Sequence, residues 1–177
     1  LVGSNLAWCH PILFQRLAAA KAARPEMRVI DVDPRVTATS ELADLHLGLA
    51  PGSDVALFAG LLAHLERAGR RDAAFVADHT SGLDAALAAV APFADVAEVA
   101  RVTGLASADI RRFYDTFAAT EKVVTVYSQG VNQSSAGSDK VNAILNCHLL
   151  TGRIGREGTG PFSVTGQPNA MGGREVG

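Results

Sequence analysis

Small polar, amide and charged side chains follow two short apolar runs near the start of this sequence, and each run has the composition of a buried parallel strand. In open α/β sheets, ligands bind beyond the carboxyl ends of the strands, where free backbone N–H groups hold phosphate and carboxylates accept bonds from ribose. We therefore predict nucleotide binding by the residues of the two turns, which are Gly3, Ser4, Asn5, Asp31, Asp33, Arg35 and Thr37. The glycine spacing GxGxxG is missing, which argues against NAD.

Simpler alternatives exist for both turns. Ser4 and Asn5 are also ordinary turn formers. Arg35 is close enough in sequence to pair with Asp33 or Asp31 on the surface. A third candidate group, Gly52 and Asp54, precedes an amphipathic helix, where a carboxylate ordinarily interacts with the helix dipole. Ser53 is the predicted N-cap of that helix.

The last third of the sequence, from Tyr127 onward, is rich in glycine and amide residues. Such composition is poor for a core, because glycine adds no buried side-chain surface and buried amides need partners. It suits a backbone that lies close to a large polar ligand. The candidate ligand-binding residues of this stretch are Gln129, Gly130, Asn132, Gln133, Gly166, Gln167 and Asn169.

The elements that must position these residues follow an α/β pattern. Strands are predicted at 28–33, 45–49 and 123–127, with residues 1–2 as the end of a further strand. Helices are predicted at 12–23, from 55 to 65 and at 140–150, and residues 72–120 are mostly helical. We predict a Rossmann-like parallel sheet flanked by helices in 1–126, with a helical insertion at about 72–120. Residues 127–177 are predicted to form a loop-helix-loop segment with glycine-rich loops.

Composition excludes several classes of protein. The chain has 177 residues, 48% hydrophobic and 19% charged, which argues against disorder. A net charge of −2 gives no electrostatic attraction to nucleic acid or an anionic membrane, and no apolar run approaches the roughly 18–20 residues of a membrane span. We expect neither partner.

Cysteine and histidine usage points away from a metal site within this sequence. Cys9 and Cys147 are isolated, and no CxxC, HxH or HxxxH pair occurs. A disulfide between the two cysteines stays open, although a reduced compartment is favoured. Ser134-Ser135 lacks the GxSxG pattern of a hydrolase. The sequence starts at a strand end and stops within a glycine pattern, so we expect an internal piece of a longer polypeptide.

Taken together, the ordered segments resemble the molybdopterin guanine dinucleotide oxidoreductases, and among them the assimilatory nitrate reductases. The segments that carry the resemblance are GSNLAWCHP (3–11), DVDPRVTAT (31–39), DLHLGLAPGSD (44–54), TEKVVTVYSQGVNQSSAGSDKVNAILNCHLLTGRIG (120–155) and GPFSVTGQPNAMGGREVG (160–177). One departure is Ala50, which stands where such proteins commonly carry a basic residue, so a phosphate contact there is not expected.

The resemblance implies a molybdenum cofactor made of two pterin–guanine dinucleotides and the two-electron reduction of nitrate to nitrite. It implies that Asp54 accepts bonds from the Watson–Crick edge of guanine, and that the candidates from Gln129 onward lie along the pterin. It places the molybdenum ligand and the cysteines of a 4Fe-4S cluster upstream of Leu1, so this chain alone is expected to be inactive. An electron-donor protein or domain and a cytoplasmic location are also implied.

Two alternatives remain. One is a formate dehydrogenase or another oxoanion reductase of the same superfamily, since the metal ligand and substrate funnel lie largely outside this sequence. The other is a non-catalytic nucleotide-binding domain, like the central domains of thiamine-dependent enzymes. That domain would use Asp33 and Asp54 but would have no use for the closing glycine and amide residues.

Overall fold

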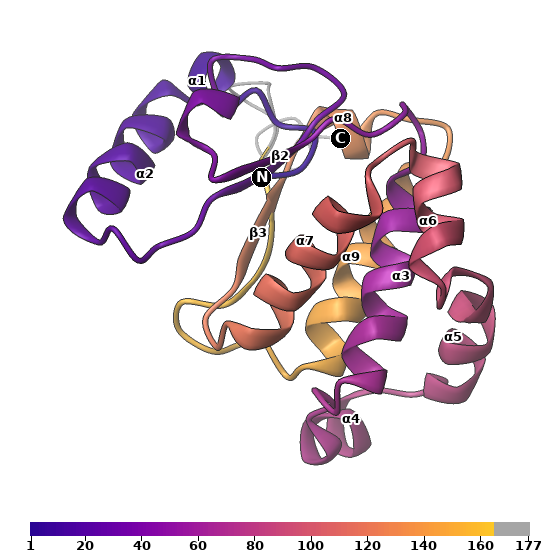
Figure 1. The fold of residues 1–177 in the computed structure, drawn as a ribbon. Coiled ribbons are helices and arrows are strands. Elements are labelled where there is room, and N and C mark those ends of the chain that lie inside the picture. Colours follow the sequence, from indigo (N-terminus) through magenta and orange to yellow (C-terminus); the bar gives the residue numbers. More distant parts are fainter. Residues whose placement is uncertain (165–177) are drawn as a thin grey trace, which may run out of the picture.

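Short parallel strands form the centre of the protein, with helices on both sides (Figure 1). A computed structural model describes residues 1–164. The strands are β1 (Ile30–Val32), β2 (Leu45–Leu47), β3 (Val124–Tyr127) and β4 (Gly160–Ser163). β1 pairs with β2 and β3 pairs with β4, both in parallel. Val2 lies between these pairs, in parallel bridges to Val32 and Tyr127, so the spatial order is β2, β1, Val2, β3, β4.

The predicted strands are found, although each is shorter than the apolar run that indicated it. β4 was not predicted. Its residues Gly160 and Pro161 are poor strand formers, so the local sequence favoured a loop. Pairing with β3 overrides that preference, and Pro161, whose nitrogen has no hydrogen to donate, is accommodated at the edge of the sheet.

Helices account for most of the remaining described residues. They are α1 (Leu6–Cys9), α2 (Pro11–Ala23), α3 (Asp54–Arg67), α4 (Ala73–His79), α5 (Leu83–Val90), α6 (Val96–Thr103), α7 (Ser107–Ala119), α8 (Gln129–Asn132) and α9 (Gly137–Leu150). Two 3₁₀ turns, η1 (Ser40–Leu42) and η2 (Ala91–Phe93), complete them. Figure 1 shows α1 and α2 on one side of the strands and α3, α6, α7 and α9 on the other.

The core gathers around α3, most of whose residues are buried. Gly60 lets α7 and α6 approach closely, because a Cβ at this position would collide with the Tyr114 hydroxyl and lie 2.7 Å from Val99 Cγ2. The Tyr114 hydroxyl donates to the Leu57 carbonyl at 2.6 Å, which satisfies a buried polar group. α9 covers the same helix, with the Cys147 thiol 3.4 Å from the Phe58 carbonyl oxygen. α3 is therefore the element against which the others are positioned.

One local prediction about α3 needs correction. Ser53 is the N-cap residue, as expected, but its side chain makes no capping bond. The Ser53 hydroxyl donates instead to the Ala50 carbonyl at 2.6 Å, within the turn that precedes the helix. The turn geometry therefore competes with capping for this hydroxyl.

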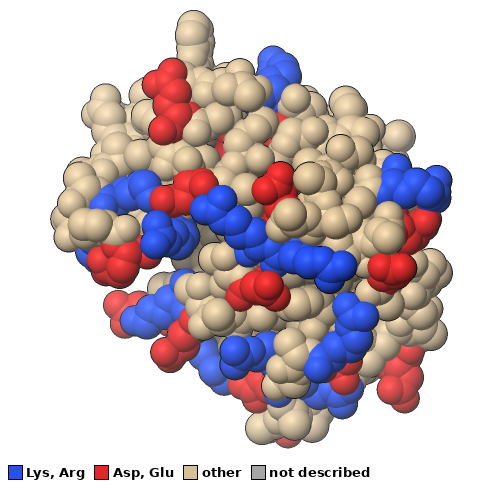
Figure 2. Space-filling view, viewed as in Figure 1, with Lys and Arg blue, Asp and Glu red and all other residues tan. Residues whose placement is uncertain are grey.

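The surface carries no dominant charge on the face shown in Figure 2, where Lys and Arg alternate with Asp and Glu. Ion pairs such as Arg101–Glu98, at 2.6 Å, account for part of this pattern. Within residues 1–164, no helix combines the length and the apolar character that crossing a membrane requires.

Candidate functional site

A cavity of about 570 Å³ opens at the carboxyl ends of Val2, β1 and β3. Polar side chains and glycine backbone line much of it. The residues that line it are Gly3, Asn5, Cys9, Asp33, Pro34, Arg35, Pro51, Gly52, Asp54, Ser128, Gln129, Gly130, Ser134 and Lys140. The fold thus brings together predicted candidates from every described segment in which they occur. Those candidates are Gly3, Asn5, Asp33, Arg35, Gly52, Asp54, Gln129 and Gly130.

Direct contact between two glycine backbones closes the floor of this cavity. Gly3 has a φ of 53° and donates its N–H to the Val32 carbonyl at 2.9 Å. Gly130 donates its N–H to the Gly3 carbonyl at 3.0 Å. A Cβ on Gly130 would lie 2.7 Å from Gly3 Cα, and a Cβ on Gly3 would lie 2.9 Å from Gly130 Cα. Any side chain at either position would push the two turns apart.

Asp33 and Arg35 form a local unit on the rim of the cavity. Asp33 Oδ1 accepts a bond from the Arg35 backbone N–H at 2.9 Å and lies 3.9 Å from Arg35 Nε. The simpler alternative considered for these residues, a local pair, is therefore present. Because the Arg35 side chain is 75% exposed, its guanidinium remains accessible to a ligand in the cavity.

A buried ion pair lies on the opposite wall. Lys140 Nζ is 2.8 Å from Asp54 Oδ2, and the two side chains are only 5% and 9% exposed. Lys140 Nζ also donates to the Gly130 carbonyl at 3.4 Å. Lys140 was not predicted as a site residue, because a lysine in the first turns of a helix ordinarily points to solvent. The pair connects the start of α3 with the Gly130 turn through the start of α9.

Several candidates do not line the cavity. Asp31 lies within β1 and is fully buried, and its Oδ2 accepts from the Ser40 hydroxyl at 2.6 Å. Burial raises the pKa of Asp31 above its ordinary value, although the bond from Ser40 opposes this. Asp31 lies within β1 and is held by Ser40, whereas Asp33 follows the last residue of that strand and lines the cavity. Asp31 is thus not placed to accept bonds from a ligand in the cavity.

The other candidates away from the cavity are held by their own neighbours or lie on the surface. The Thr37 hydroxyl accepts from the Thr39 N–H at 3.2 Å, and Asn132 Nδ2 donates to the Ser163 hydroxyl at 3.0 Å. Gln133 is exposed. Ser4 is buried, and its hydroxyl has no hydrogen-bond partner among residues 1–164. Gly166, Gln167 and Asn169 lie outside the described residues, and so do the loops they belong to.

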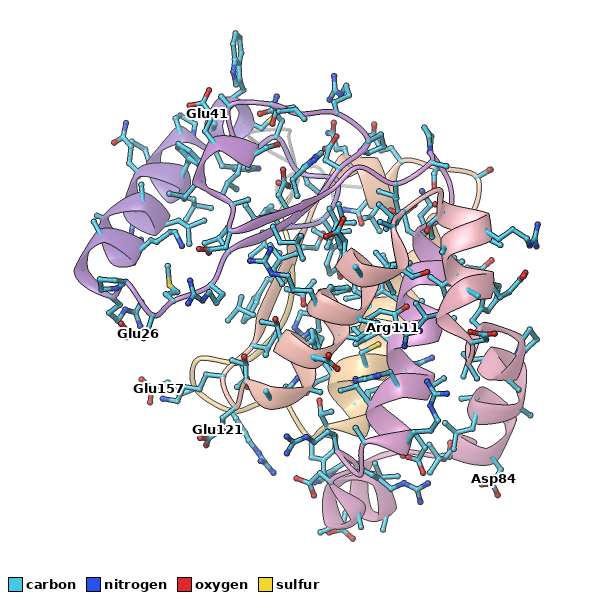
Figure 3. The ribbon with its side chains drawn as sticks, viewed as in Figure 1. Glu26, Glu41, Asp84, Arg111, Glu121 and Glu157 are labelled. Atoms are coloured by element: carbon cyan, nitrogen blue, oxygen red, sulfur yellow. The ribbon has the colours of Figure 1, made fainter. Side chains whose placement is uncertain are left out.

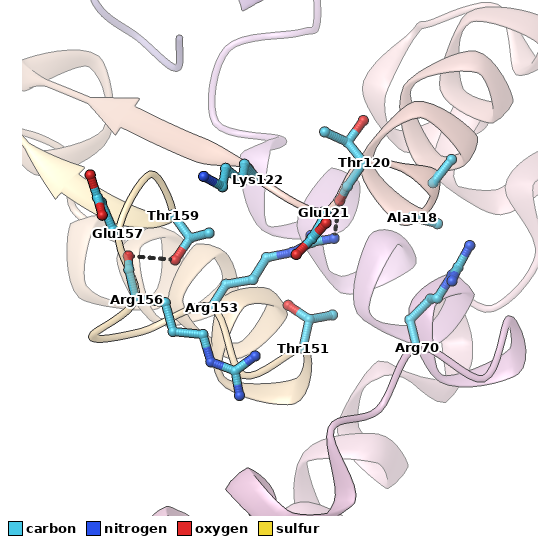
Figure 4. A pocket seen from close by; sticks show the side chains of 11 residues that line it. Arg70, Ala118, Thr120, Glu121, Lys122, Thr151, Arg153, Arg156, Glu157 and Thr159 are labelled. Carbon is cyan, nitrogen blue, oxygen red and sulfur yellow. Dashed lines mark hydrogen bonds between the residues drawn. The ribbon is translucent and has the colours of Figure 1, made fainter.

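A second cavity, of about 310 Å³, opens near the amino ends of β3 and β4 (Figure 4). Its cationic residues are Arg70, Lys122, Arg153 and Arg156. Arg153 Nη2 donates to the carbonyls of Phe117 at 3.1 Å and Thr120 at 2.5 Å, which end α7.

Charged neighbours surround the second cavity. Arg156 pairs with Asp72 at 2.7 Å. Glu121, between α7 and β3, and Glu157, between α9 and β4, project outward (Figure 3). Among the residues that line this cavity, none belongs to the predicted site.

The described part of the chain offers neither a cluster of metal ligands nor a disulfide. No group of three or more His, Cys, Asp or Glu side chains within residues 1–164 is arranged to hold a metal ion. Cys9 is exposed and Cys147 is buried, and both are free thiols, so the disulfide left open by the sequence is not formed. Burial raises the pKa of Cys147, so that thiol stays protonated near neutral pH.

Comparison with known families identifies the chain. The family model described as "Molybdopterin oxidoreductase" matches residues 1–177. The chain belongs to the molybdopterin oxidoreductase family. Its mixture of helices with short parallel strands is consistent with the fold of that family. The resemblance indicated by the sequence segments is thereby confirmed at the level of the family.

Two nitrate reductases are among the curated proteins to which the chain is similar. A nitrate reductase of Klebsiella oxytoca is 52% identical over 177 residues, which is 100% of this chain and 20% of that protein. A nitrate reductase of Shewanella frigidimarina is 50% identical, over 100% of this chain and 19% of that protein. The chain thus spans about a fifth of the length of the curated relatives it matches.

A solved structure of the same general fold is acetylene hydratase from Pelobacter acetylenicus. It matches with a TM-score of 0.74 and 24% sequence identity, over 82% of this chain and 20% of that chain. At this identity, the likeness shows only that the two chains share a fold.

Proposed function

We propose that this chain holds one guanine dinucleotide of the molybdenum cofactor within a nitrate reductase. The observation that carries the proposal is the cavity at the carboxyl ends of the strands, which gathers candidates from widely separated segments. This edge of a parallel sheet is where such folds bind nucleotides. The relatives that are about half identical to the chain bear the name nitrate reductase, which supports nitrate as the substrate.

The residues of the cavity fit a dinucleotide in chemistry. The Gly3–Gly130 contact leaves a floor of backbone on which a pyrophosphate can lie close to N–H groups. Gly52 has a φ of 88° and open space where a Cβ would stand. We assign phosphate contacts to Asn5 and Arg35, ribose contacts to Asp33, and guanine recognition to Asp54. Gly3, whose N–H is bonded to Val32, contributes only the close approach of its backbone.

The spatial order of the strands supports a Rossmann-like description of the domain. Numbered along the chain, with Val2 as the first, the strands lie in the order 3-2-1-4-5, which is the order of the dinucleotide-binding folds. The order reverses between Val2 and β3, where the Gly3–Gly130 contact lies. We propose that 1–126, with the helices of 72–120 as an insertion, form this domain. Gln129, Gly130 and Lys140 complete the cavity of this domain. We propose that other residues of 127–177 reach the second dinucleotide.

The remaining chemistry belongs to the complete protein. When bound, the molybdenum cofactor would supply the two-electron, oxygen-atom-transfer chemistry by which nitrate becomes nitrite. The residues that line the cavity bind and orient the nucleotide end of that cofactor. We place the 4Fe-4S cluster, the molybdenum ligand and the docking site of the electron donor in the other parts of the polypeptide, and the whole protein in the cytoplasm.

The proposal is tested on the native-length protein that contains this chain. We expect molybdenum, about two equivalents of GMP released by acid hydrolysis per molybdenum, and reduction of nitrate with a reduced dye as donor. Release of CMP or of no nucleotide would contradict the guanine assignment. Oxidation of formate without reduction of nitrate would contradict the assigned substrate and leave the cofactor assignment intact.

A second experiment examines the nucleotide site itself. Asp54→Asn is expected to reduce affinity for GMP by roughly ten-fold or more, since one of the carboxylate's acceptor positions is replaced by a donor. Asp109→Asn is the matched control, because Asp109 is also an acidic residue in the first turn of a helix but does not line the cavity. Equal affinity for GMP and AMP in both the unmodified chain and Asp54→Asn would contradict the site.

A further inference from the structure

Lys140 is the polar residue of the cavity whose burial most requires an explanation. An ammonium is rarely buried, and Lys140, on α9, is only 4% exposed. Removing a charge from water is costly, and an apolar pair of similar size is often as stable as a buried ion pair. Stabilisation of the fold is therefore a weak explanation for the burial of Lys140 beside Asp54.

The bonds of Lys140 leave part of its capacity free. An ammonium has three N–H donors. Two acceptors lie near Nζ among the described residues, Asp54 Oδ2 at 2.8 Å and the Gly130 carbonyl oxygen at 3.4 Å. One donor remains for a group in the cavity, which both Lys140 and Asp54 line.

The pair presents a donor next to an acceptor, and this pattern matches one base. Guanine carries an acceptor, O6, beside two donors, N1–H and the N2 amino group. Adenine has the opposite order on the corresponding atoms, with an amino group at position 6 and an acceptor at N1. An ammonium next to a carboxylate is thus complementary to guanine and unfavourable for adenine.

We propose that Lys140 is a specificity-determining residue that donates a hydrogen bond to O6 of the guanine base, beside Asp54, which accepts from N1–H and the N2 amino group. This inference rests on the proposed nucleotide site and names its base-reading pair. The Gly130 carbonyl orients the ammonium, so the same turn that carries the backbone contact with Gly3 also positions the base-reading residue.

The test compares the binding of three nucleotides, GMP, IMP and AMP, to the native-length protein prepared without its cofactor. IMP keeps O6 and N1–H but lacks the N2 amino group, so it separates the contact of Lys140 from that of Asp54. In Lys140→Met, affinity for GMP and IMP should fall by the same factor, roughly ten-fold, the loss of one charge-assisted bond. Affinity for AMP should remain unchanged or rise.

Other outcomes overturn the inference. Equal losses for all three nucleotides would mean that Lys140 contacts phosphate or only maintains the fold. A collapse of the GMP-to-IMP ratio would mean that it acts by positioning Asp54. Unchanged affinities would remove it from the site. Lys140→Arg, which keeps a donor, should retain a preference for GMP over AMP, and circular dichroism of each variant reports on folding.

Lys122→Met is the matched control, since Lys122 lines the other cavity, and it should leave all three affinities unchanged. Failure of the inference is distinguishable from failure of the proposed function. If the unmodified chain does not prefer GMP, the nucleotide site itself is wrong. If it prefers GMP and Lys140→Met keeps that preference in full, only the role of Lys140 is wrong.

Discussion

The two ends of the strands carry similar numbers of polar groups but use them differently. At the amino ends, the buried guanidinium of Arg153 donates to carbonyls at the end of α7, and Arg156 pairs with Asp72. At the carboxyl ends, Lys140 and Asp54 pair beside an open cavity of about 570 Å³, and glycine backbone forms its floor. A cationic hollow is thus not by itself a binding site, because the guanidinium groups of Arg153 and Arg156 are occupied by the end of α7 and by Asp72.

The largest expected effect comes from a substitution that disrupts the backbone contact at the carboxyl ends of the strands. Gly130→Val places a side chain against the backbone of Gly3, at 2.7 Å from its Cα for Cβ alone, and neither turn has a flexible group that can yield. We expect a loss of at least about 5 kcal/mol in the free energy of unfolding, enough to prevent folding. Circular dichroism and urea unfolding measure it.

Gly48→Ala is the control for that substitution, since a Cβ on Gly48 meets only the His46 ring at 3.4 Å. It should cost less than about 1 kcal/mol. If Gly130→Val folds with nearly unchanged stability, the backbone contact does not determine the geometry of the cavity.

The next effect is at the amino end. Arg153→Leu leaves the carbonyls of Phe117 and Thr120 without their donor, and also removes the guanidinium that lies over the Phe117 ring. We expect a loss of about 4 kcal/mol in stability, from two poorly satisfied carbonyls. Affinity for GMP should not change in the folded fraction. A large loss of affinity for GMP with unchanged stability would contradict the comparison, because it would give Arg153 a role in binding and not in stability.

A pH effect of intermediate size comes from the core between the two ends. Burial, helped by the nearby Arg153 charge, lowers the pKa of His148 from its ordinary value of 6.5 to about 4. Nε2 of this histidine is 2.8 Å from the Thr125 hydroxyl. Between these pH values the unfolded chain binds a proton that the folded chain does not. Stability from this group is therefore complete above pH 6.5 and is lost as the pH falls towards 4.

The size of that loss is at most about 3 kcal/mol, from the difference between the two pKa values. Urea unfolding at a series of pH values measures it, and the His148→Gln variant should lack this component. If both proteins show the same pH dependence between 4 and 6.5, burial of His148 is not its source.

The smallest effect is expected from the surface pair of the amino end. Arg156→Ala removes the bond to Asp72, and the Arg156 side chain is 59% exposed. Exposed pairs contribute less than about 1 kcal/mol. Urea unfolding at low and high salt should show a small difference that salt removes. A loss comparable to that of Arg153→Leu would show that the exposed and buried arginines contribute alike.

The sequence alone predicted the part of the site that depends on strand ends. Gly3, Asp33 and Gly130 follow short apolar runs, and parallel pairing is enough to bring such turns to one edge. Lys140 was missed because its burial depends on how α9 packs against α3, which no local pattern records. Asp31 was included because the pattern could not tell a residue inside a three-residue strand from one just past its end.

Val2 has a consequence for the order in which the molecule assembles. This residue fills the central position of the strands, and its N–H donates to Val126 at 2.8 Å, while Gly3 donates to Val32. Its two neighbours in space are synthesised at very different times. β1 and β2 are synthesised soon after Val2, whereas β3, on the other side of Val2, is synthesised about a hundred residues later. Sheet formation therefore waits for a long-range closure, which makes folding slow compared with that of the surrounding helices.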